Sequence, residues 1–324
     1  MNRRAVVLPK SPRPRRSLDA ECTCDSNVAR KDVVMILVTG ATGTIGRLLL
    51  AELRGKAEVR AMTRDPEKAR AALGALGETI ELVRGDYDDA RTLTSALEGA
   101  SSLFLLAAPG PTVSDHDRAM MNAVAAAGAK RSLTKVVKLS ALGADASPLL
   151  RAGAWHQPGE RAVRESGLAW TILRPGGFAS NALGWAASLR SGTEIEVATS
   201  DGRHGVIDPR DVAAVAARAL LSNELDGRGF TLTGPEAIST PDQLAILGEA
   251  LGRPVVMKLV TPDHAADKMA SFGVPAPFVE AVREGHGFVR SGRAAELTGS
   301  VAEILGRPAR SFRTWVNDHL AAFG

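Results

Sequence analysis

Three evenly spaced glycines, at positions 40, 43 and 46, follow directly after the first continuous apolar segment of the chain, residues 35–39. Such a segment is typical of a strand buried on both faces, and residues 47–54 then show a helical pattern. In a strand-turn-helix unit, the first glycine permits a sharp turn, the second lets a phosphate approach the backbone, and the third lets the helix pack closely. Free N–H groups at the helix start can then bind a pyrophosphate. We therefore predict a dinucleotide-binding loop made by Gly40, Ala41, Thr42, Gly43, Thr44, Ile45 and Gly46.

The end of the second apolar segment indicates which dinucleotide this loop accepts. Sites specific for NAD place an Asp or Glu about 20 residues beyond the glycines to bind the ribose hydroxyls, whereas this chain has Thr63 and Arg64 there. A hydroxyl and a guanidinium suit a ribose 2′-phosphate. The alternative is that Arg64 is an ordinary surface residue and that Asp65 binds the ribose. We predict NADP(H) as the cofactor, with NAD(H) as the less favoured one.

Two further polar residues end apolar segments. Asp86 could accept a hydrogen bond from an adenine amino group, although an Asp that opens a turn is also ordinary capping chemistry. Ser140 ends a later segment, and strand ends on that side of a parallel sheet face the ligand crevice. Its hydroxyl could bind a substrate carbonyl, or it could simply satisfy the strand end.

A histidine and a glutamate could supply acid–base chemistry. His156 and Glu160 are four residues apart, a spacing that places both on one face of a helix. An unperturbed histidine has a pKa of about 6.5, so His156 could donate a proton, although it could equally cap or line the helix start. Pro158 fits best in a first helical turn, which would make His156 or Gln157 the cap. We expect Glu160 to be structural and to pair with Arg164.

These residues need a framework, and the sequence alternates apolar and helical segments. Strands are expected at 58–62, 80–84, 102–107, 135–140 and 170–173, and helices around 66–75, 90–98, 115–129 and 155–166. Alternation at this spacing predicts an α/β fold with a doubly wound parallel sheet. A helix over 209–221 and a strand over 229–233 should close the sheet.

We expect three parts along the chain. Residues 1–34, rich in Arg, Pro and Ser, form a disordered basic tail. Residues 35–176 form the nucleotide-binding core, and residues 177–324 form mainly a smaller substrate lobe, from which 206–234 return to the core. The ligand cleft of such a fold lies between core and lobe.

Composition argues against several classes of function. The formal net charge of +4 arises entirely within residues 1–34, so the body has no basic excess and we expect no nucleic-acid binding. Cys22 and Cys24 are the only cysteines, and because two ligands do not close a zinc site, we expect no metal. No apolar stretch approaches the ~20 residues of a membrane span, and the run from Ala5 to Leu8 is too short for a secretory signal. We expect a cytoplasmic protein that does not bind membranes.

Several of these motifs together resemble the NmrA-like family of atypical short-chain dehydrogenases/reductases. The segments that carry the resemblance are Val38 to Gly46, Thr63-Arg64, Gly85-Asp86, Leu139-Ser140-Ala141, Leu173-Arg174-Pro175 and Asp208 to Ala213. The resemblance covers about residues 35–320. It implies an extended Rossmann fold with a smaller C-terminal substrate lobe. It also implies either an NADPH-dependent reductase, such as a quinone reductase, or a non-catalytic sensor of the NADP(H) pool.

The resemblance further implies roles for individual residues. It places the pyrophosphate at residues 40–46, the 2′-phosphate at Arg64, the adenine at Asp86, and the nicotinamide near the backbone of Ala107, Ala108 and Ser140. Ordinary members of the larger superfamily use a Tyr-x-x-x-Lys pair, but the only tyrosine here, Tyr87, lies in the adenine region. At the matching spacing stand His156 and Glu160.

The missing tyrosine bears on the substrate. Reduction of a simple ketone creates a strongly basic alkoxide that benefits from a positioned acid, whereas a quinone or conjugated enone yields a delocalised anion that water can protonate. We therefore predict an NADPH-dependent reductase of a small conjugated carbonyl or quinone-like compound, with secondary metabolism as a fitting setting. His156 is the candidate proton donor, and Ser140 is the candidate to hydrogen-bond the substrate carbonyl.

Residues after the Arg174-Pro175 turn could line the substrate pocket. Phe178 and Asn181 are the candidates, although aromatic and apolar residues at such spacing more often belong to a core. Two other functions stay open. One is a non-catalytic regulator that senses NADP(H) and would need a protein partner, and the other is a redox-neutral epimerase or cyclase that uses bound NAD(P).

Overall fold

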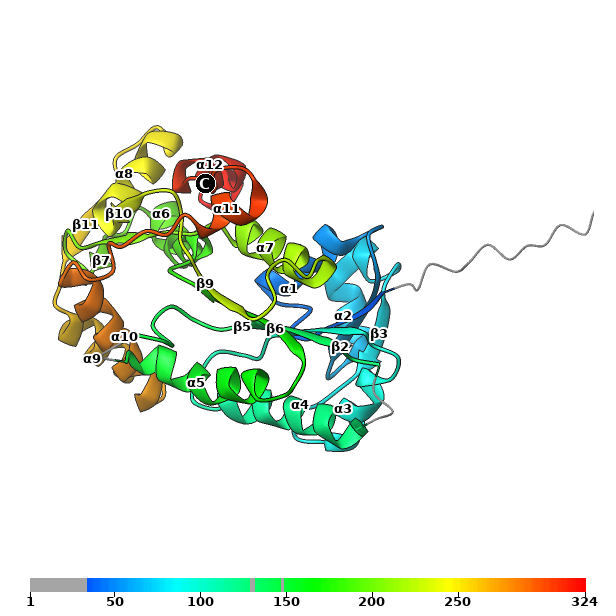
Figure 1. Cartoon of the computed structure of the whole chain (residues 1–324). Helices are drawn as coiled ribbons and strands as arrows, with labels where there is room; N and C mark the ends of the chain where they lie inside the picture. The colour runs from blue at the N-terminus through cyan, green and yellow to red at the C-terminus, as the bar shows by residue number, and fades with distance from the viewer. Residues whose placement is uncertain (1–33, 129–131, 147–148) are drawn as a thin grey trace, which may run out of the picture. The chain divides into compact units, whose positions relative to one another are not determined.

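A parallel sheet of seven strands is the framework of the fold in the computed structural model (Figure 1). Its strands are β1 (Met35–Val38), β2 (Glu58–Thr63), β3 (Glu81–Arg84), β4 (Ser102–Leu105), β5 (Lys135–Leu139), β6 (Ala169–Pro175) and β9 (Arg228–Leu232). The strand order β3-β2-β1-β4-β5-β6-β9 places later strands on both sides of β1, so the doubly wound parallel sheet is confirmed. The structure describes residues 34–128, 132–146 and 149–324. The tail expected at 1–34, with Cys22 and Cys24, lies outside them except for its last residue.

Helices cover both faces of this sheet. On one face α1 (Thr44–Leu53) packs against α7 (Pro209–Leu221), and α2 (Pro66–Leu73) lies beside β3. On the other face α3 (Ala90–Leu97), α4 (Val113–Ala127) and α5 (Arg151–Arg164) lie side by side (Figure 1). Because both faces are covered, the central strands are buried on both sides, which explains their continuous apolar runs.

The strand register brings four strand ends together at one edge. Val38 of β1 pairs with Phe104 of β4, and Leu139 of β5 pairs with Leu173 of β6. The residues that follow these strands therefore meet at the carboxyl edge, where open α/β sheets bind their ligands.

Outside the sheet and its helices, a separate, smaller apolar core surrounds Trp315 and Phe312. Residues from a 3-10 helix (Ala179–Trp185), α6 (Ala186–Ser191), α8 (Thr240–Leu251) and α12 (Phe312–Asp318) contribute to this core. Helices α9 (Pro262–Ser271) and α10 (Ala276–Arg290) pack against each other. Two short strand pairs complete this part of the chain, β7 (Ile195–Val197) with β11 (Met257–Leu259) and β8 (Arg203–Gly205) with β10 (Ala237–Ser239). Helix α11 (Ser300–Leu305) differs, because it packs on α7 and β9. The sequence assigned this segment to the lobe, whereas Val301 belongs to the core under the sheet.

The motif from Asp208 to Asp211 holds distant parts of the fold together. Asp208 caps α7 by accepting a hydrogen bond from the N–H of Arg210 at 2.8 Å. Asp211 is fully buried and accepts hydrogen bonds from the Arg307 side chain at 2.8 Å and from the N–H of Arg310 at 2.6 Å. The motif therefore anchors the C-terminal segment to the start of α7.

Candidate functional site

The glycine loop lies at the carboxyl edge of the sheet, directly after β1. Gly40 has a φ of +62°, and a Cβ placed on it would lie 2.7 Å from the Leu106 side chain. At Gly46 a Cβ would lie 2.2 Å from the carbonyl oxygen of Gly40. Only glycine fits both places, so the sharp turn and the close helix approach predicted for these two residues are confirmed.

The N-terminus of α1 is open to a ligand. Gly43 is the N-cap residue, no side chain caps the helix, and its first turn contains no acidic residue. Thr42, Gly43 and Thr44 are exposed. The backbone N–H groups and the positive end of the helix dipole can therefore bind a pyrophosphate. The residues present fit a dinucleotide at this point.

Arg64 and Asp65, the two alternatives for the ribose, have different surroundings at the end of β2. Asp65 caps α2, because its Oδ1 accepts a hydrogen bond from the N–H of Lys68 at 3.0 Å, and its own N–H donates to Thr63 Oγ1 at 3.3 Å. Arg64 is exposed and has no hydrogen-bond partner among the described residues. This arrangement favours Arg64 and a 2′-phosphate, since the Asp65 carboxylate already serves α2.

Asp86 opens the turn after β3. Its Oδ1 accepts a hydrogen bond from the N–H of Asp88 at 3.2 Å, and its own N–H donates to Thr92 Oγ1 at 2.9 Å. Asp86 therefore stabilises the turn that it opens, and its contact with an adenine stays a prediction. The N–H of Gly85 donates to the carbonyl of Thr63 at 2.8 Å, which holds this turn beside the end of β2.

The side chain of Tyr87 extends from the turn after β3 to the turn after β4. Its hydroxyl donates to the carbonyl of Leu106 at 3.3 Å, and its ring stacks on His116 with 4.8 Å between centroids. The phenol thus reaches the turn after β4, next to Gly40. Because burial raises the pKa of Tyr87, this group stays neutral and is not a ready proton donor.

Thr39, for which no role was predicted beyond its place in the first apolar segment, fixes the distance between two strand ends. Its hydroxyl, fully buried, donates to the carbonyl of Leu106 at 2.9 Å and accepts from the Leu106 N–H at 2.7 Å. Beyond Leu106, Ala107 is buried and Ala108 is exposed. Thr39 thereby sets the backbone course of the segment expected to contact the nicotinamide. Its place immediately before the first glycine was the available signal.

Ser140 belongs to a buried ionic network. Its hydroxyl donates to Glu160 Oε1 at 2.6 Å, so its proton is engaged and it is not free to donate to a substrate carbonyl. Glu160 also accepts from Arg174 Nε at 2.8 Å and from Arg164 at 2.7 Å, which confirms the expected pair with Arg164 and adds a partner the sequence did not suggest. Burial alone would raise the pKa of Glu160, but the hydrogen bonds from Arg174 and Ser140 outweigh it and hold that pKa below its usual range.

Helix α5 begins earlier than Pro158 suggested. Its N-cap is Leu150, so Pro158 lies inside the helix and neither His156 nor Gln157 is the cap. The residues before the proline include alanines and arginine, which favour a helix and extend it by one turn. His156 therefore sits within the helix, and only 8% of it is exposed.

The surroundings of His156 contradict the expectation of an ordinary imidazole. Neither ring nitrogen has a hydrogen-bond partner among the described residues, and Nδ1 is buried. Burial, and then the positive charge of Lys138, lower the pKa of His156 to about 4. The ring is therefore uncharged at neutral pH, which counts against the general-acid role predicted from an unperturbed pKa.

A buried ion pair joins β5 to α4 and was not predicted from the sequence. Lys138 Nζ of β5 is 2.5 Å from Asp117 Oδ2 of α4, and both side chains are 0% exposed. A lysine in the middle of a short apolar strand was the only available signal, because the partner lies 21 residues away in sequence.

The two residues predicted to line the substrate pocket differ in burial. Phe178 is half-buried and packs partly on the core under the sheet, while Asn181 is exposed. Helix α10 instead brings Phe278 to this edge, where its ring lies 5.5 Å from that of Trp155. A Cβ on Gly110 would lie 2.6 Å from the Phe278 ring. This aromatic pair was missed, since the two residues are far apart in sequence.

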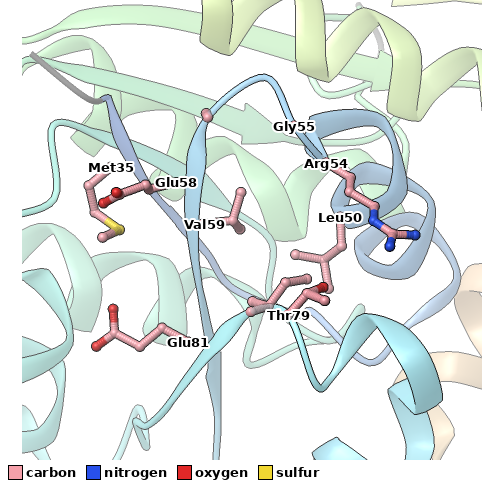
Figure 2. Close-up of a pocket in the computed structure, with 10 residues that line it drawn as sticks. Met35, Leu50, Arg54, Gly55, Glu58, Val59, Thr79 and Glu81 are labelled. Atoms are coloured by element: carbon pink, nitrogen blue, oxygen red, sulfur yellow. The ribbon is translucent and has the colours of Figure 1, made fainter. Parts of the chain in front are cut away.

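A cavity of about 380 Å³ lies at the opposite, amino edge of the sheet (Figure 2). It is lined at the starts of β1, β2 and β3 by Met35, Glu58 and Glu81, with Arg54 from the end of α1. Because ligands of such sheets bind at the carboxyl ends of the strands, this cavity is separate from the candidate site. Among residues 34–128, 132–146 and 149–324, no group of three or more His, Cys, Asp or Glu could hold a metal, and no helix is long and apolar enough to cross a membrane.

Comparison with known proteins gives consistent matches over most of the chain. Residues 40–223 match the protein family described as NAD(P)H-binding. The chain is 38% identical over 290 residues to (4-alkanoyl-5-oxo-2,5-dihydrofuran-3-yl)methyl phosphate reductase of Streptomyces griseus, which covers 89% of this chain and 99% of that protein. It is 34% identical over 291 residues to NAD(P)H azoreductase of Xenophilus azovorans, which covers 90% of this chain and 99% of that protein.

A solved structure supports the same relationship. The chain is similar to NADPH-dependent quinone oxidoreductase of Escherichia coli complexed with NADPH, with a TM-score of 0.77 and 29% identity, over 89% of this chain and 100% of that one. The match includes the C-terminal elements as well as the sheet, so the extended Rossmann fold is confirmed.

Proposed function

The chain belongs to the NAD(P)H-binding, NmrA-like family of atypical short-chain dehydrogenases/reductases, and from this premise we propose that it is an NADPH-dependent reductase of a small conjugated carbonyl or quinone-like compound. The observation that carries the proposal is that the polar side chains at the carboxyl edge have no proton to donate readily. Among the described residues, the candidates for an acid, Ser140, Tyr87 and His156, all lack a readily donated proton.

The chain's own residues fit NADP(H). The open N-terminus of α1 and the glycine turn can hold the pyrophosphate. Arg64, which no described side chain binds, can contact a 2′-phosphate, while Asp65 caps α2. When bound, NADPH supplies the hydride that a reductase transfers. The backbone at Ala107 and Ala108, whose course Thr39 sets, is proposed to line the nicotinamide side.

The lack of an acid favours acceptors that need none. The Ser140 proton is held by Glu160, the Tyr87 hydroxyl is bound to the Leu106 carbonyl, and His156 carries no charge at neutral pH. A simple ketone would leave a strongly basic alkoxide at this edge. A conjugated acceptor spreads the negative charge over its π system, so water can protonate it after hydride transfer.

The relatives support this class of substrate. Their names specify an acylated dihydrofuranone phosphate, azo compounds and quinones, and each of these can delocalise the charge that a hydride brings. On the protein side, we propose that Phe178 and Asn181, together with the Trp155 and Phe278 rings, contact the acceptor. Cytoplasmic location, a setting in secondary metabolism and the division into core and lobe at 176 stay predictions.

NADPH oxidation against a matched panel tests the proposal. The panel holds benzoquinones, naphthoquinones and cyclic enones, paired with their saturated ketone counterparts. We expect turnover with at least one conjugated class and none with the saturated ketones. Preferential turnover of saturated ketones would refute the substrate class, and tight NADPH binding without turnover of any acceptor would favour an NADP(H) sensor instead.

A further inference from the structure

The hydrogen-bond ladder between β4 and β5 opens at the carboxyl edge of the sheet. The last residues of the two strands that pair in register are Leu105 and Lys138. If the parallel ladder continued, the N–H of Ala107 would donate to the carbonyl of Leu139, and the N–H of Ala141 would donate to the carbonyl of Ala107. Neither hydrogen bond is present. The backbones that follow β4 and β5 are therefore not bonded to each other at this edge.

On its other side, the backbone after β5 stays bonded to β6. The N–H of Ser140 donates to the carbonyl of Leu173 at 2.7 Å, and the N–H of Leu142 donates to the carbonyl of Pro175 at 3.0 Å. Successive N–H groups of an extended chain point to alternate sides of it within the sheet. The N–H of Ala141 therefore points away from β6 and toward the end of β4.

A side chain replaces the missing donor at one of these positions. The carbonyl of Leu139 accepts a hydrogen bond from Lys138 Nζ at 3.2 Å, and Asp117 holds the same ammonium at 2.5 Å. Because this carbonyl already has a donor, it does not need the N–H of Ala107. The buried ion pair thus allows the ladder to stay open.

The open ladder leaves two backbone donors without an acceptor. Ala107 is only 4% exposed and Ala141 is half-buried. Within residues 34–128, 132–146 and 149–324, no group accepts a hydrogen bond from either N–H. Backbone N–H groups that are withdrawn from water are nearly always paired, so a ligand is the expected partner here. Both residues follow strand ends on the edge where such sheets bind ligands.

The order of the strands assigns the Ala141 N–H to the acceptor rather than to the cofactor. Strand β4 lies between β1 and β5. The glycine loop that fits the pyrophosphate follows β1, and the backbone proposed to line the nicotinamide, at Ala107 and Ala108, follows β4. The end of β5 is one strand further from the glycine loop. A molecule that lies beyond the nicotinamide therefore meets Ala141.

We propose that the backbone N–H of Ala141 hydrogen-bonds the carbonyl oxygen of the acceptor and stabilises the negative charge that hydride transfer leaves on it. The inference rests on the proposed function and adds the group that binds the acceptor oxygen. A fixed backbone N–H stabilises such a charge without giving up its proton. It fits an edge at which the Ser140 hydroxyl is bound to Glu160 and water protonates the product.

Replacing Ala141 by L-lactic acid removes this N–H alone, because it converts one amide into an ester. The ester weakens the Ser140 carbonyl as an acceptor, but the backbone nitrogen opposite that carbonyl belongs to Pro175 and has no hydrogen. No hydrogen bond of the described residues is lost, so we expect an unchanged melting temperature. With an accepted quinone we expect kcat to fall about 10- to 100-fold, as for the loss of one hydrogen bond to a charged oxygen. The affinity for NADPH should not change.

Two controls separate the N–H from other effects. Ala141→Gly keeps the N–H and removes only the methyl group, so it should retain kcat. The N–H of Ala146 donates to the carbonyl of Gly143 at 3.3 Å, at the exposed end of the same turn. Lactic acid at Ala146 should leave kcat nearly unchanged.

Binding of 4-nitrophenolate to the complex with NADP⁺ gives a measurement without turnover. This probe carries its charge on an oxygen, as a quinol anion does, and its absorbance reports binding. We expect the Ala141 ester to bind it about tenfold more weakly than the wild type. In wild-type protein labelled with ¹⁵N-alanine, the proton signal of the Ala141 N–H, assigned with Ala141→Gly, should move downfield when the phenolate binds.

An unchanged kcat together with an unchanged phenolate affinity in the Ala141 ester would overturn the proposal. A loss confined to NADPH affinity would do the same, because it would assign the N–H to the cofactor. Equal losses of kcat with lactic acid at Ala141 and at Ala146 would also count against it. If no acceptor is turned over, the proposed function fails, while phenolate binding and the Ala141 signal still decide whether this N–H binds an anionic oxygen.

Discussion

Glu160→Gln is expected to lower the free energy of unfolding by about 3 kcal/mol at pH 7. Glutamine keeps the shape of the side chain but removes the charge that balances Arg174, which is only 4% exposed. Removing one partner of a buried ion pair costs roughly 3–5 kcal/mol. We expect the lower end of this range, because Arg174 keeps its ion pair with Asp145 at 2.5 Å. The Arg164 side chain is 40% exposed, so solvent screens the charge that Glu160→Gln leaves unbalanced there.

The effect of this substitution should depend on pH in a defined direction. The folded-state pKa of Glu160 lies below its unfolded value, because hydrogen bonds from Arg174 and Ser140 outweigh burial. Its charge therefore contributes stability that is fully present above the pKa of an unfolded glutamate and is lost as the pH falls through the folded-state pKa. The difference between wild type and Glu160→Gln should shrink as the pH is lowered through that window.

Urea unfolding followed by circular dichroism at pH 7 and at several lower values measures both quantities. Glu165→Gln, one residue beyond α5 and exposed, is the matched control and should change stability by less than about 0.5 kcal/mol. A difference below about 1 kcal/mol for Glu160→Gln at pH 7, or one that stays constant with pH, would refute the account of this network.

Three further outcomes follow from the site. Arg64→Ala should weaken NADPH binding about 10- to 100-fold and leave NADH binding nearly unchanged, because one charge-assisted hydrogen bond contributes ~1.5–3 kcal/mol. Calorimetric titration measures this, with Arg54→Ala at the opposite edge as the control, and equal losses for both cofactors would contradict it. Gly46→Ala should abolish measurable NADPH binding and lower stability by about 1–3 kcal/mol, since its Cβ would lie 2.2 Å from the Gly40 carbonyl oxygen. Gly184→Ala, where a Cβ would meet nothing within 4 Å, should do neither, and retained NADPH affinity in Gly46→Ala would count against the loop. The rate of turnover should not change through ionisation of His156 between about pH 5.5 and 8, because the pKa of His156 is about 4. A rate change near the ordinary histidine pKa that is lost in His156→Gln would contradict this.

The framework of the fold could be read from local sequence patterns. Continuous apolar runs marked the parallel strands, because both faces of the sheet are covered by helices. The glycine spacing also predicted the turn at Gly40 and the close packing at Gly46. These features depend on neighbours within a few residues, so they are visible in one stretch of sequence.

The polar chemistry of the edge could not be read in the same way. Ser140 and Glu160 were both singled out, but their hydrogen bond and the Arg174 partner depend on the register of β5, β6 and α5. The pKa of His156 is lowered first by burial and then by the charge of Lys138, and both depend on elements other than α5. The helix start predicted from Pro158 was wrong, because the loss of one backbone hydrogen bond is tolerated inside a well-packed helix.

Single-turnover hydride transfer tests the central claim most directly. The preformed complex of the protein with NADPH is mixed with a benzoquinone, and loss of the reduced nicotinamide absorbance is followed over time, with NADPH deuterated on either face of C4 as the comparison. The account predicts rapid oxidation that one of the two deuterium labels slows and that does not vary with pH around neutrality. A complex that holds NADPH tightly but does not pass hydride to any conjugated acceptor would contradict it.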